Sequence, residues 1–343
     1  MRIGIASDSS PTVDLLRKIV LRVPGYDISW VARTGAQTVD KCAFDTPDLI
    51  LMGLTLPVMD GVAATQRIMT ISPCPILLIT TSLDGDKARV FEAMGYGALD
   101  AINTPLAGTY AAARSSQDAL LKKISTIEKL KWAPPPPQTY AAAPQSMVRN
   151  IPNLVVIGSS TGGPKALAQI LSRLPATFQA GIVMAQHVDD EFSKGMVDWL
   201  NSQTPLRVML AREGARPEPG TAYLGGSKQH LIITKKMALG FTDQPEGLYF
   251  RPSVDLFFES AAEHWPVKGV AVLLTGMGRD GALGLAALRK RGWHTIAQDE
   301  TTSVVYGMPK AARELGAARK ILAVDQVAPE LLRWTQKART GKT

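Results

Sequence analysis

Short apolar runs alternate with amphipathic stretches over the first 107 residues of the chain. Apolar runs that predict buried strands lie at residues 2–6, 27–31, 49–52, 76–79 and 98–102. Between them, apolar positions recur at helical spacing, as over residues 12–21 and 61–69, which predicts amphipathic helices. Five strands with intervening helices in about 105 residues are typical of a flavodoxin-like, doubly wound parallel sheet. The pattern therefore predicts an α/β domain over residues 1–130, with a last helix over residues 110–130.

A change of composition separates this unit from a second one. Four consecutive prolines at residues 134–137 favour an extended spacer, so we place a proline-rich linker at residues 131–150. The α/β alternation then resumes, with strands predicted at residues 154–157, 181–185, 207–210, 221–224, 231–234 and 269–274. Continuous apolar runs are expected where helices cover both faces of a sheet. We therefore predict a second doubly wound parallel sheet over residues 151–338.

Composition and charge narrow the classes of function. The chain has 343 residues, a length natural for two domains, and its two cysteines exclude a disulfide framework and a cysteine-based zinc site. The net charge of +8 comes from basic residues that are spread along the chain, without a basic stripe interleaved with aromatics. We therefore expect no nucleic-acid partner, and an acidic protein surface suits this charge better.

The chain carries no pattern of a membrane protein. Its first residues reach Asp8 before the apolar core of a signal peptide could form. No apolar run approaches the roughly 18 residues of a membrane span. We therefore expect a cytoplasmic protein without membrane insertion.

The candidate chemistry begins with a serine at the end of the first strand of the second unit. The sequence Gly158-Ser159-Ser160-Thr161-Gly162 follows the apolar run at 154–157 and leads into a helical pattern at 164–171. A G-x-S-x-G turn between a buried strand and a helix presents its central serine at the top of a parallel sheet, beside backbone N–H groups. A phosphate-binding loop is the alternative, but the chain lacks G-x-G-x-x-G and the P-loop lysine here. The turn therefore predicts Ser160 as a nucleophile.

Two further polar residues follow predicted strands at the same edge of the sheet. His187 follows the strand at 181–185, and Asp280 follows the strand at 269–274 after a glycine-rich turn. Taken alone, His187 is also compatible with a core histidine, and G-x-S-x-G occurs in many loops by chance. Together the three residues can form a nucleophile, a base and an orienting acid. Backbone N–H groups near Thr161 and in the turn at 276–278 are expected to hold the oxyanion.

At these residues the chain resembles the CheB family, the chemotaxis protein-glutamate methylesterases. Several motifs in the family's order carry the resemblance, and they are Gly158-Ser159-Ser160-Thr161-Gly162-Gly163-Pro164, Gln186-His187, Arg251-Pro252-Ser253-Val254-Asp255, Leu274-Thr275-Gly276-Met277-Gly278-Arg279-Asp280-Gly281-Ala282, Gln298-Asp299-Glu300 and Tyr306-Gly307-Met308-Pro309. Within the family, residues 1–5, 91–95 and 98–105 are most similar to the WspF-like branch, which acts in surface sensing.

The resemblance implies a carboxylic ester hydrolase that acts on chemoreceptors. Its substrates would be glutamate γ-methyl esters on the cytoplasmic helices of the receptors, and it would also deamidate receptor glutamines. Ser160 would be the nucleophile, His187 the base and Asp280 the third member of the triad, with Thr161 and Met277 in oxyanion binding and positioning. The resemblance implies no cofactor for the esterase.

The resemblance also implies that the first unit is a response-regulator receiver. Such a receiver covers the esterase cleft until a CheA-like histidine kinase phosphorylates it. An active receiver needs an acidic pair after the first strand, an acceptor aspartate after the third, a hydroxyl after the fourth and a lysine after the fifth. Magnesium lies between the acids and the phosphoryl group. This chain has Ser7-Asp8, Gly53, Thr80 and Thr104 at those positions. Glycine offers no oxygen, so we expect no phosphorylation at Gly53. Asp8 is a weak candidate magnesium ligand, and a magnesium site is doubtful.

Asp60 is a candidate to replace the missing acceptor, but its place in the turn after the third strand predicts a structural role. The receiver is then either a fixed inhibitory cap or a docking module. Two other functions stay open for the whole chain. One is a non-catalytic pseudo-response-regulator that docks on receptors or signalling partners, and the other is a general esterase of small substrates.

Overall fold

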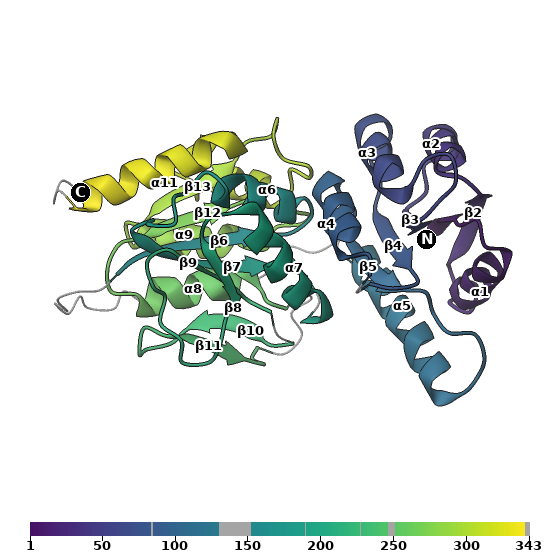
Figure 1. The fold of residues 1–343 in the computed structure, drawn as a ribbon, viewed down its shortest axis with the longest axis horizontal. Helices are drawn as coiled ribbons and strands as arrows, with labels where there is room; N and C mark the ends of the chain where they lie inside the picture. Colours follow the sequence, from purple (N-terminus) through teal and green to yellow (C-terminus); the bar gives the residue numbers. More distant parts are fainter. Residues whose placement is uncertain (84, 130–151, 189, 227, 246–250, 340–343) are drawn as a thin grey trace. The chain divides into compact units, whose positions relative to one another are not determined.

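The computed structural model describes residues 1–83, 85–129, 152–188, 190–226, 228–245 and 251–339. The chain divides into two units, Met1–Ala133 and Pro134–Thr343, each with its own core (Figure 1). The linker predicted at residues 131–150 lies outside the described residues. Each unit is therefore described by itself.

The first unit is a five-stranded parallel sheet with the strand order β2-β1-β3-β4-β5. This order confirms the predicted flavodoxin-like fold. Its strands are β1 (Arg2–Ala6), β2 (Asp27–Ala32), β3 (Leu49–Gly53), β4 (Ile76–Thr80) and β5 (Asp100–Asn103). Its helices are α1 (Ser10–Val20), α2 (Gly35–Phe44), α3 (Gly61–Ile71), α4 (Lys87–Tyr96) and α5 (Ala111–Lys129).

One core of the first unit lies between the sheet and the helices α1 and α5. Alternate residues of the strands point to this face because successive side chains of a strand point to opposite sides. The helices contribute residues spaced three or four apart, which lie on one helical face. The strand residues are Ile3, Ile5, Leu49, Leu51, Leu77 and Ile79, and the main helical ones are Val13, Leu16, Ile19, Leu120, Ile124 and Ile127.

The second unit is a seven-stranded parallel sheet with the order β14-β13-β12-β6-β7-β9-β8. Its strands are β6 (Asn153–Ser159), β7 (Ala180–Gln186), β8 (Arg207–Leu210), β9 (Thr221–Leu224), β12 (Val270–Leu273), β13 (His294–Gln298) and β14 (Lys320–Leu322). Its helices are α6 (Gly163–Leu171), α7 (Asp190–Gln203), α8 (Val254–His264), α9 (Ala282–Lys290), α10 (Met308–Glu314) and α11 (Val324–Arg339). The predicted α/β class and parallel sheet are confirmed for this unit.

One predicted strand does not belong to the parallel sheet. The run at residues 231–234 forms β10 (His230–Ile233), which pairs antiparallel with β11 (Leu239–Thr242) in a separate two-stranded sheet. The connection between the two strands is a tight turn closed by the bond from the Thr234 N–H to the Ala238 carbonyl, 2.8 Å long. So short a connection can join antiparallel but not parallel strands. The hairpin packs on α8.

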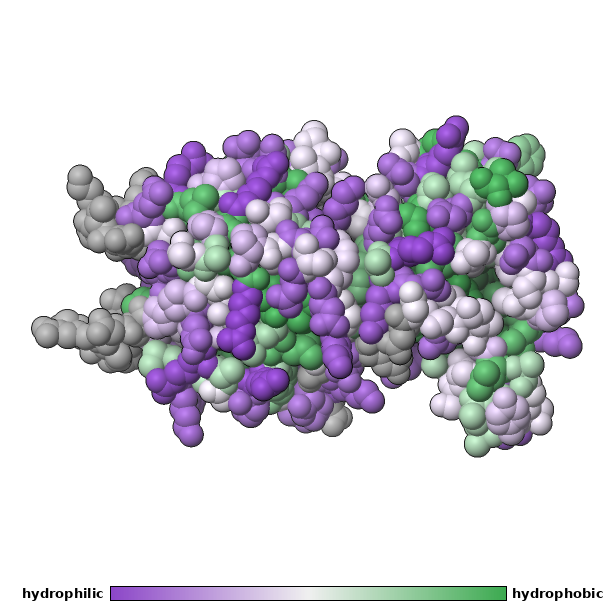
Figure 2. Space-filling view, in the orientation of Figure 1, coloured by the Kyte–Doolittle hydropathy of each residue, from purple (hydrophilic) through white to green (hydrophobic). Residues whose placement is uncertain are grey.

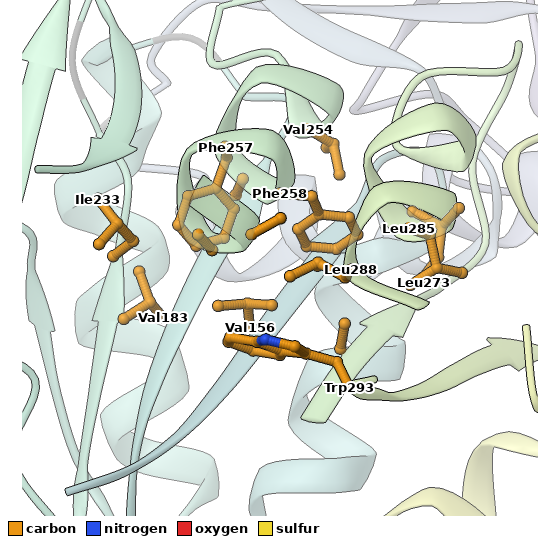
Figure 3. Close-up of a cluster of buried hydrophobic side chains, with 14 of the residues drawn as sticks. Val156, Val183, Ile233, Val254, Phe257, Phe258, Leu273, Leu285, Leu288 and Trp293 are labelled. Atoms are coloured by element: carbon orange, nitrogen blue, oxygen red, sulfur yellow. The ribbon is translucent and has the colours of Figure 1, made fainter. Parts of the chain in front are cut away.

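Helix α8 is fixed to the sheet by a large apolar cluster (Figure 3). Its residues Val254, Phe257 and Phe258 are fully buried beside Leu285 and Leu288 of α9. Burial of each phenylalanine contributes about 1.5–3 kcal/mol to stability. The sheet side of the cluster includes Val156, Val183 and Leu273. Because Val254 is the first residue of α8, this packing also fixes where the helix begins.

Within the part of the chain that the structure describes, no helix is long and apolar enough to cross a membrane. On the face drawn in Figure 2, hydrophilic residues are interspersed with small hydrophobic areas over both units.

Gly158 tests the fit between β6 and α8. A Cβ at this position would lie 2.1 Å from Val254 Cγ1 and 3.2 Å from Leu273 Cδ1. We expect Gly158→Ala to lower the free energy of unfolding by about 1–3 kcal/mol because the core has no room for the added methyl. Thermal or denaturant unfolding measures the loss. In a Val254→Ala background, which removes the clashing methyl, the same change should cost less, and an equal cost in both backgrounds would contradict this account.

Candidate active site

Ser160 lies at the turn where β6 ends and α6 begins. Its N–H donates to the Thr275 carbonyl at 3.0 Å, and its own carbonyl accepts from Gln186 Nε2 at 2.9 Å. Gly162 has a φ of +78°, and a Cβ there would lie 2.6 Å from Val304. The turn therefore needs glycine at this position. These contacts fix the backbone of Ser160. The residue is 7% exposed.

His187 directly follows β7, the strand beside β6, and lies at the same carboxyl edge of the sheet as Ser160. Ser159 of β6 and Gln186 of β7 are paired in register, and the Ser159 hydroxyl donates to Gln186 Oε1 at 2.6 Å. The His187 N–H donates to the Ser159 carbonyl at 3.1 Å. Adjacent strands are about 4.8 Å apart, so Ser160 and His187, the next residues on each, are neighbours at the carboxyl edge.

Asp280 reaches the same place from β12, on the other side of β6. It lies in a turn between Gly278 and Gly281, whose φ values are +81° and +88°. Its Oδ2 is 2.8 Å from His187 Nε2, and the two side chains are 13% and 6% exposed. The structure thus brings together the histidine and the aspartate that the sequence predicted, beside the predicted serine.

The start of α8 surrounds the Asp280 carboxylate with donors. The Ser253 hydroxyl donates to Oδ1 at 3.0 Å, the Asp255 N–H donates to Oδ1 at 2.9 Å, and the Val254 N–H donates to Oδ2 at 2.7 Å. The N-terminus of a helix also carries partial positive charge. A buried carboxylate is costly unless it is satisfied in this way.

These donors set the protonation of the pair. Burial alone would raise the pKa of Asp280, but the hydrogen bond and the charge of His187, together with the N–H groups of Asp255 and Val254, hold that pKa below its ordinary value. An ionised carboxylate only accepts hydrogen bonds, so His187 Nε2 must be the donor. Neutral His187 therefore carries its proton on Nε2, and Nδ1 is the ring nitrogen that can act as a base.

A second carboxylate lies one residue into the same helix. Asp255 Oδ1 accepts from the Gly284 N–H of α9 at 2.8 Å, and the pKa of Asp255 is raised well above its ordinary value by burial and by the charge of Asp280. The two neighbouring acids thus shift in opposite directions.

The two residues predicted for oxyanion binding lie on either side of Ser160. The Thr161 carbonyl accepts from the buried Thr275 hydroxyl at 2.9 Å, which fixes the turn after the nucleophile. A Cβ on Gly276 would lie 2.7 Å from Ser160 Cβ, so the turn that contains Met277 lies against the nucleophile. Because the Ser160 N–H bonds the Thr275 carbonyl, the N–H groups of Thr161 and Met277 are the better candidates for oxyanion donors.

The predicted receiver residues lie together at the carboxyl edge of the first sheet. Asp8 follows β1 and is exposed, Gly53 ends β3, Thr80 ends β4 and Thr104 follows β5. The Thr104 N–H and hydroxyl both contact the Thr80 carbonyl, at 2.7 and 3.2 Å. The Thr80 hydroxyl donates to the Asp86 carboxylate at the start of α4.

Gly53 and Asp60 differ in what surrounds them. A Cβ on Gly53 would lie 3.3 Å from the Ala6 carbonyl oxygen and 3.4 Å from Leu56 Cδ2, so a side chain fits there only if these neighbours shift slightly. Asp60 caps α3 through the bond from the Ala63 N–H to its carboxylate, 2.9 Å long, and pairs with Arg89 at 3.1 Å. Asp60 thus has the structural contacts that its place in the turn predicts.

Sequence reasoning assigned no role to Ser253 or Thr275, although both lie within motifs that carry the family resemblance. Ser253 had a detectable signal, because a serine before Asp255 in an apolar stretch is an N-cap pattern. His230 had none, since its contact with the N–H of Ser253, at 3.1 Å, depends on the packing of a hairpin against a helix.

Comparison with known proteins relates both units to characterised families. Residues 155–331 match the family described as CheB methylesterase, and residues 3–109 match the response regulator receiver domain. A protein-glutamate methylesterase/protein-glutamine glutaminase of Burkholderia lata is 51% identical over 332 residues, which cover 96% of this chain and 98% of the relative. A protein of Pseudomonas aeruginosa with the same activities in its name is 46% identical, with the same coverage of both chains. The crystal structure of the Thermotoga maritima CheB methylesterase catalytic domain is 36% identical with a TM-score of 0.51, and the match covers 54% of this chain and all of that one.

The shifted pKa of Asp255 predicts a pH-dependent stability. Because its folded pKa lies above the unfolded value, the ionisation of Asp255 costs stability as the pH rises through these values. Asp255→Asn keeps an acceptor for Gly284 and removes the charge, so we expect a gain on the order of 1 kcal/mol at pH 7 that vanishes below about pH 4. Unfolding as a function of pH measures it, with the exposed Asp243→Asn as the control. A loss of stability at pH 7, or a gain that does not depend on pH, would contradict the raised pKa.

Proposed function

The chain belongs to the CheB methylesterase family, and on this premise we propose that Ser160 is the nucleophile of a protein-glutamate methylesterase. The substrates are γ-methyl esters of glutamate side chains, and the same acyl transfer removes ammonia from glutamine side chains. The observation that carries the proposal is the 2.8 Å hydrogen bond between His187 and the largely buried Asp280, which lies beside the serine turn. The rival function is a non-catalytic pseudo-response-regulator that docks on its partners.

The reaction follows from the roles of the three side chains. Ser160 Oγ attacks the ester carbonyl while His187 Nδ1 takes its proton, and Asp280 stabilises the imidazolium that forms. The N–H groups of Thr161 and Met277 hold the negative oxygen of the tetrahedral intermediate. The intermediate breaks the bond to the methoxy oxygen, His187 returns the proton and methanol leaves. A water molecule, activated by His187 in turn, then releases the glutamate side chain and restores Ser160.

The receiver domain and the membership of the CheB family together support a role in chemosensory signalling. The specific partners that fit are the methylated cytoplasmic helices of a chemoreceptor as substrate and a CheA-like histidine kinase upstream. Such helices are rich in glutamate, and the net charge of +8 suits an acidic partner.

The receiver residues do not fit a magnesium-dependent phosphorylation site. Gly53 supplies no oxygen, Asp8 is a single acid, and the Thr80 hydroxyl is bonded to Asp86. Magnesium is held by carboxylates and phosphate oxygens, so this set of donors is too small to replace its usual ligands. The first unit therefore acts without an aspartyl phosphate at position 53.

Removal of the nucleophile tests the enzymatic proposal. We expect Ser160→Ala in the full chain to reduce methanol release from methylated receptor by at least about 10³-fold, because the acyl step loses its attacking oxygen. Gas chromatography of methanol measures the rate. Ser172→Ala, which removes an exposed hydroxyl just after α6, is the matched control and should keep the full rate.

The outcomes of this assay separate the alternatives. If neither the unaltered chain nor its isolated second unit releases methanol in a Ser160-dependent way, the chain is a pseudo-regulator. If it hydrolyses small esters with no preference for receptor, it is a general esterase.

Incubation with acetyl phosphate and magnesium tests the receiver. We expect no acid-labile phosphate on residues 1–130, since Gly53 has no acceptor oxygen. Gly53→Asp should restore labelling only in part. It supplies the acceptor carboxylate, but its Cβ needs a small shift of the Ala6 carbonyl and Leu56, and Ser7 and Thr104 still stand where an active receiver has an acid and a lysine. Mass spectrometry of the intact chain measures the adduct. A stable adduct on the unaltered receiver would show that another residue accepts the phosphate.

A further inference from the structure

A fully buried histidine outside the predicted triad contacts the residue that begins α8. His230 is the first residue of β10 and is 0% exposed. Its Nδ1 accepts a hydrogen bond from the Ser253 N–H at 3.1 Å. Ser253 is the N-cap of α8, and it also contacts Asp280. His230 is therefore one residue away from the carboxylate that orients the base.

The hydrogen bonds form a continuous series from the hairpin to the base. His230 Nδ1 fixes the Ser253 peptide, the Ser253 hydroxyl donates to Asp280 Oδ1 at 3.0 Å, and Asp280 Oδ2 accepts from His187 Nε2 at 2.8 Å. The Ser253 peptide also sets the direction of the next two N–H groups, which both donate to the same carboxylate. A change in this one peptide would therefore alter three of the four donors of Asp280.

The protonation of His230 agrees with this use of Nδ1. A ring nitrogen accepts only when it carries no proton, so a neutral His230 holds its proton on Nε2. Burial and the charge of Arg251 lower the pKa of His230, against the opposing charges of Asp280 and Asp243, which keeps the ring neutral. Arg251 itself pairs with Asp243 at 3.0 Å.

His230 Nε2 has no hydrogen-bond partner among the residues that the structure describes. An unsatisfied buried donor is unfavourable, and an apolar ring would fill the same space without that cost. The imidazole therefore brings an advantage that its packing alone does not explain. That advantage is the acceptor at Nδ1.

We propose that His230 is a positioning residue for the triad, which holds the Ser253 peptide so that the start of α8 keeps its donors on Asp280. The proposal rests on the proposed function of Ser160, since it concerns the same catalytic unit. His230 does not touch the reacting atoms, and it acts through Ser253 and Asp280.

A second histidine supplies a matched control. His264, at the end of α8, also ties this helix to β10, through its Nδ1 and the Ile233 carbonyl at 2.9 Å. It lies at the opposite end of the helix from Asp280. If histidines merely hold the hairpin on the helix, His230 and His264 should behave alike.

The test uses two variants at each position in the full chain. Asparagine places a polar atom where Nδ1 was, and glutamine places one where Nε2 was. We expect His230→Gln to lower kcat for methanol release by about 10- to 100-fold with little change in KM, because a small misplacement of catalytic groups has effects of this size. His230→Asn should largely restore kcat, and both His264 variants should keep it.

The pH dependence of kcat distinguishes a positioning role from a purely structural one, because a purely structural role of His230 would leave it unchanged. Loss of donors from Asp280 raises the affinity of the Asp280–His187 pair for a proton. We therefore expect the acidic limb of kcat to move to higher pH in His230→Gln and to stay in place in His230→Asn and in the His264 variants. Equal losses in both His230 variants, or an unmoved limb in His230→Gln, would overturn the proposal.

Two further measurements keep the result decisive. The rate at which a fluorophosphonate labels Ser160 reports on the triad without any receptor, so it tests His230 even if the unaltered chain releases no methanol and the proposed substrate is wrong. If His230→Gln does not fold, ¹⁵N NMR of the unaltered chain determines the tautomer of His230. A proton on Nε2 would support the proposal, and a proton on Nδ1 would overturn it.

Discussion

The active site depends on one constraint, which is that the largely buried carboxylate of Asp280 accepts hydrogen bonds from the start of helix α8. Asp280 would be unstable as an anion in this core, but two backbone N–H groups, the Ser253 hydroxyl and His187 satisfy its oxygens. Because it stays ionised, it fixes which nitrogen of His187 bears the proton and leaves Nδ1 for Ser160. The apolar cluster under α8 matters for the same reason, since it holds Val254, the first residue of the helix, together with Phe257 and Phe258, and so fixes where the N–H groups of the helix start point (Figure 3).

In each unit, polar residues gather at the carboxyl edge of that unit's own parallel sheet, but the two groups of residues differ in the chemistry they can support. In the second unit, Ser160, His187 and Asp280 follow β6, β7 and β12 at this edge, and His187 contacts Asp280, as the proposed triad requires. In the first unit, residues at the carboxyl ends of β1, β3, β4 and β5 also lie together, but Gly53 has no side-chain oxygen and the Thr80 hydroxyl is bonded to Asp86. The residues proposed for catalysis are therefore complete in the second unit, whereas those needed for control by phosphorylation are incomplete in the first. The proposed catalysis rests on Ser160, and the receiver residues do not supply the acceptor for a phosphorylation switch.

Much of the fold followed from the apolar pattern, because strands buried on both faces are continuous apolar runs, and the runs at 2–6 and 221–224 coincide with observed strands. Periodicity could not show that β10 pairs antiparallel with β11, since the alternation of side chains is the same for both pairings. At the site, Ser160, His187 and Asp280 were predictable because each follows a strand. His230 was not, because it lies 23 residues before Ser253 and meets it only when the hairpin packs on α8.

The central claim is that Asp280 is held as an anion at neutral pH while its neighbour Asp255 resists ionisation. Carboxyl ¹³C NMR of aspartate-labelled protein, titrated with acid and assigned with Asp255→Asn and Asp280→Asn, measures both groups directly. The account predicts that the Asp280 signal stays in its ionised position through the ordinary aspartate range near pH 3.9 and titrates below it. Asp255 should titrate above that range. An Asp280 signal that protonates at a higher pH than that of Asp255 would contradict the account.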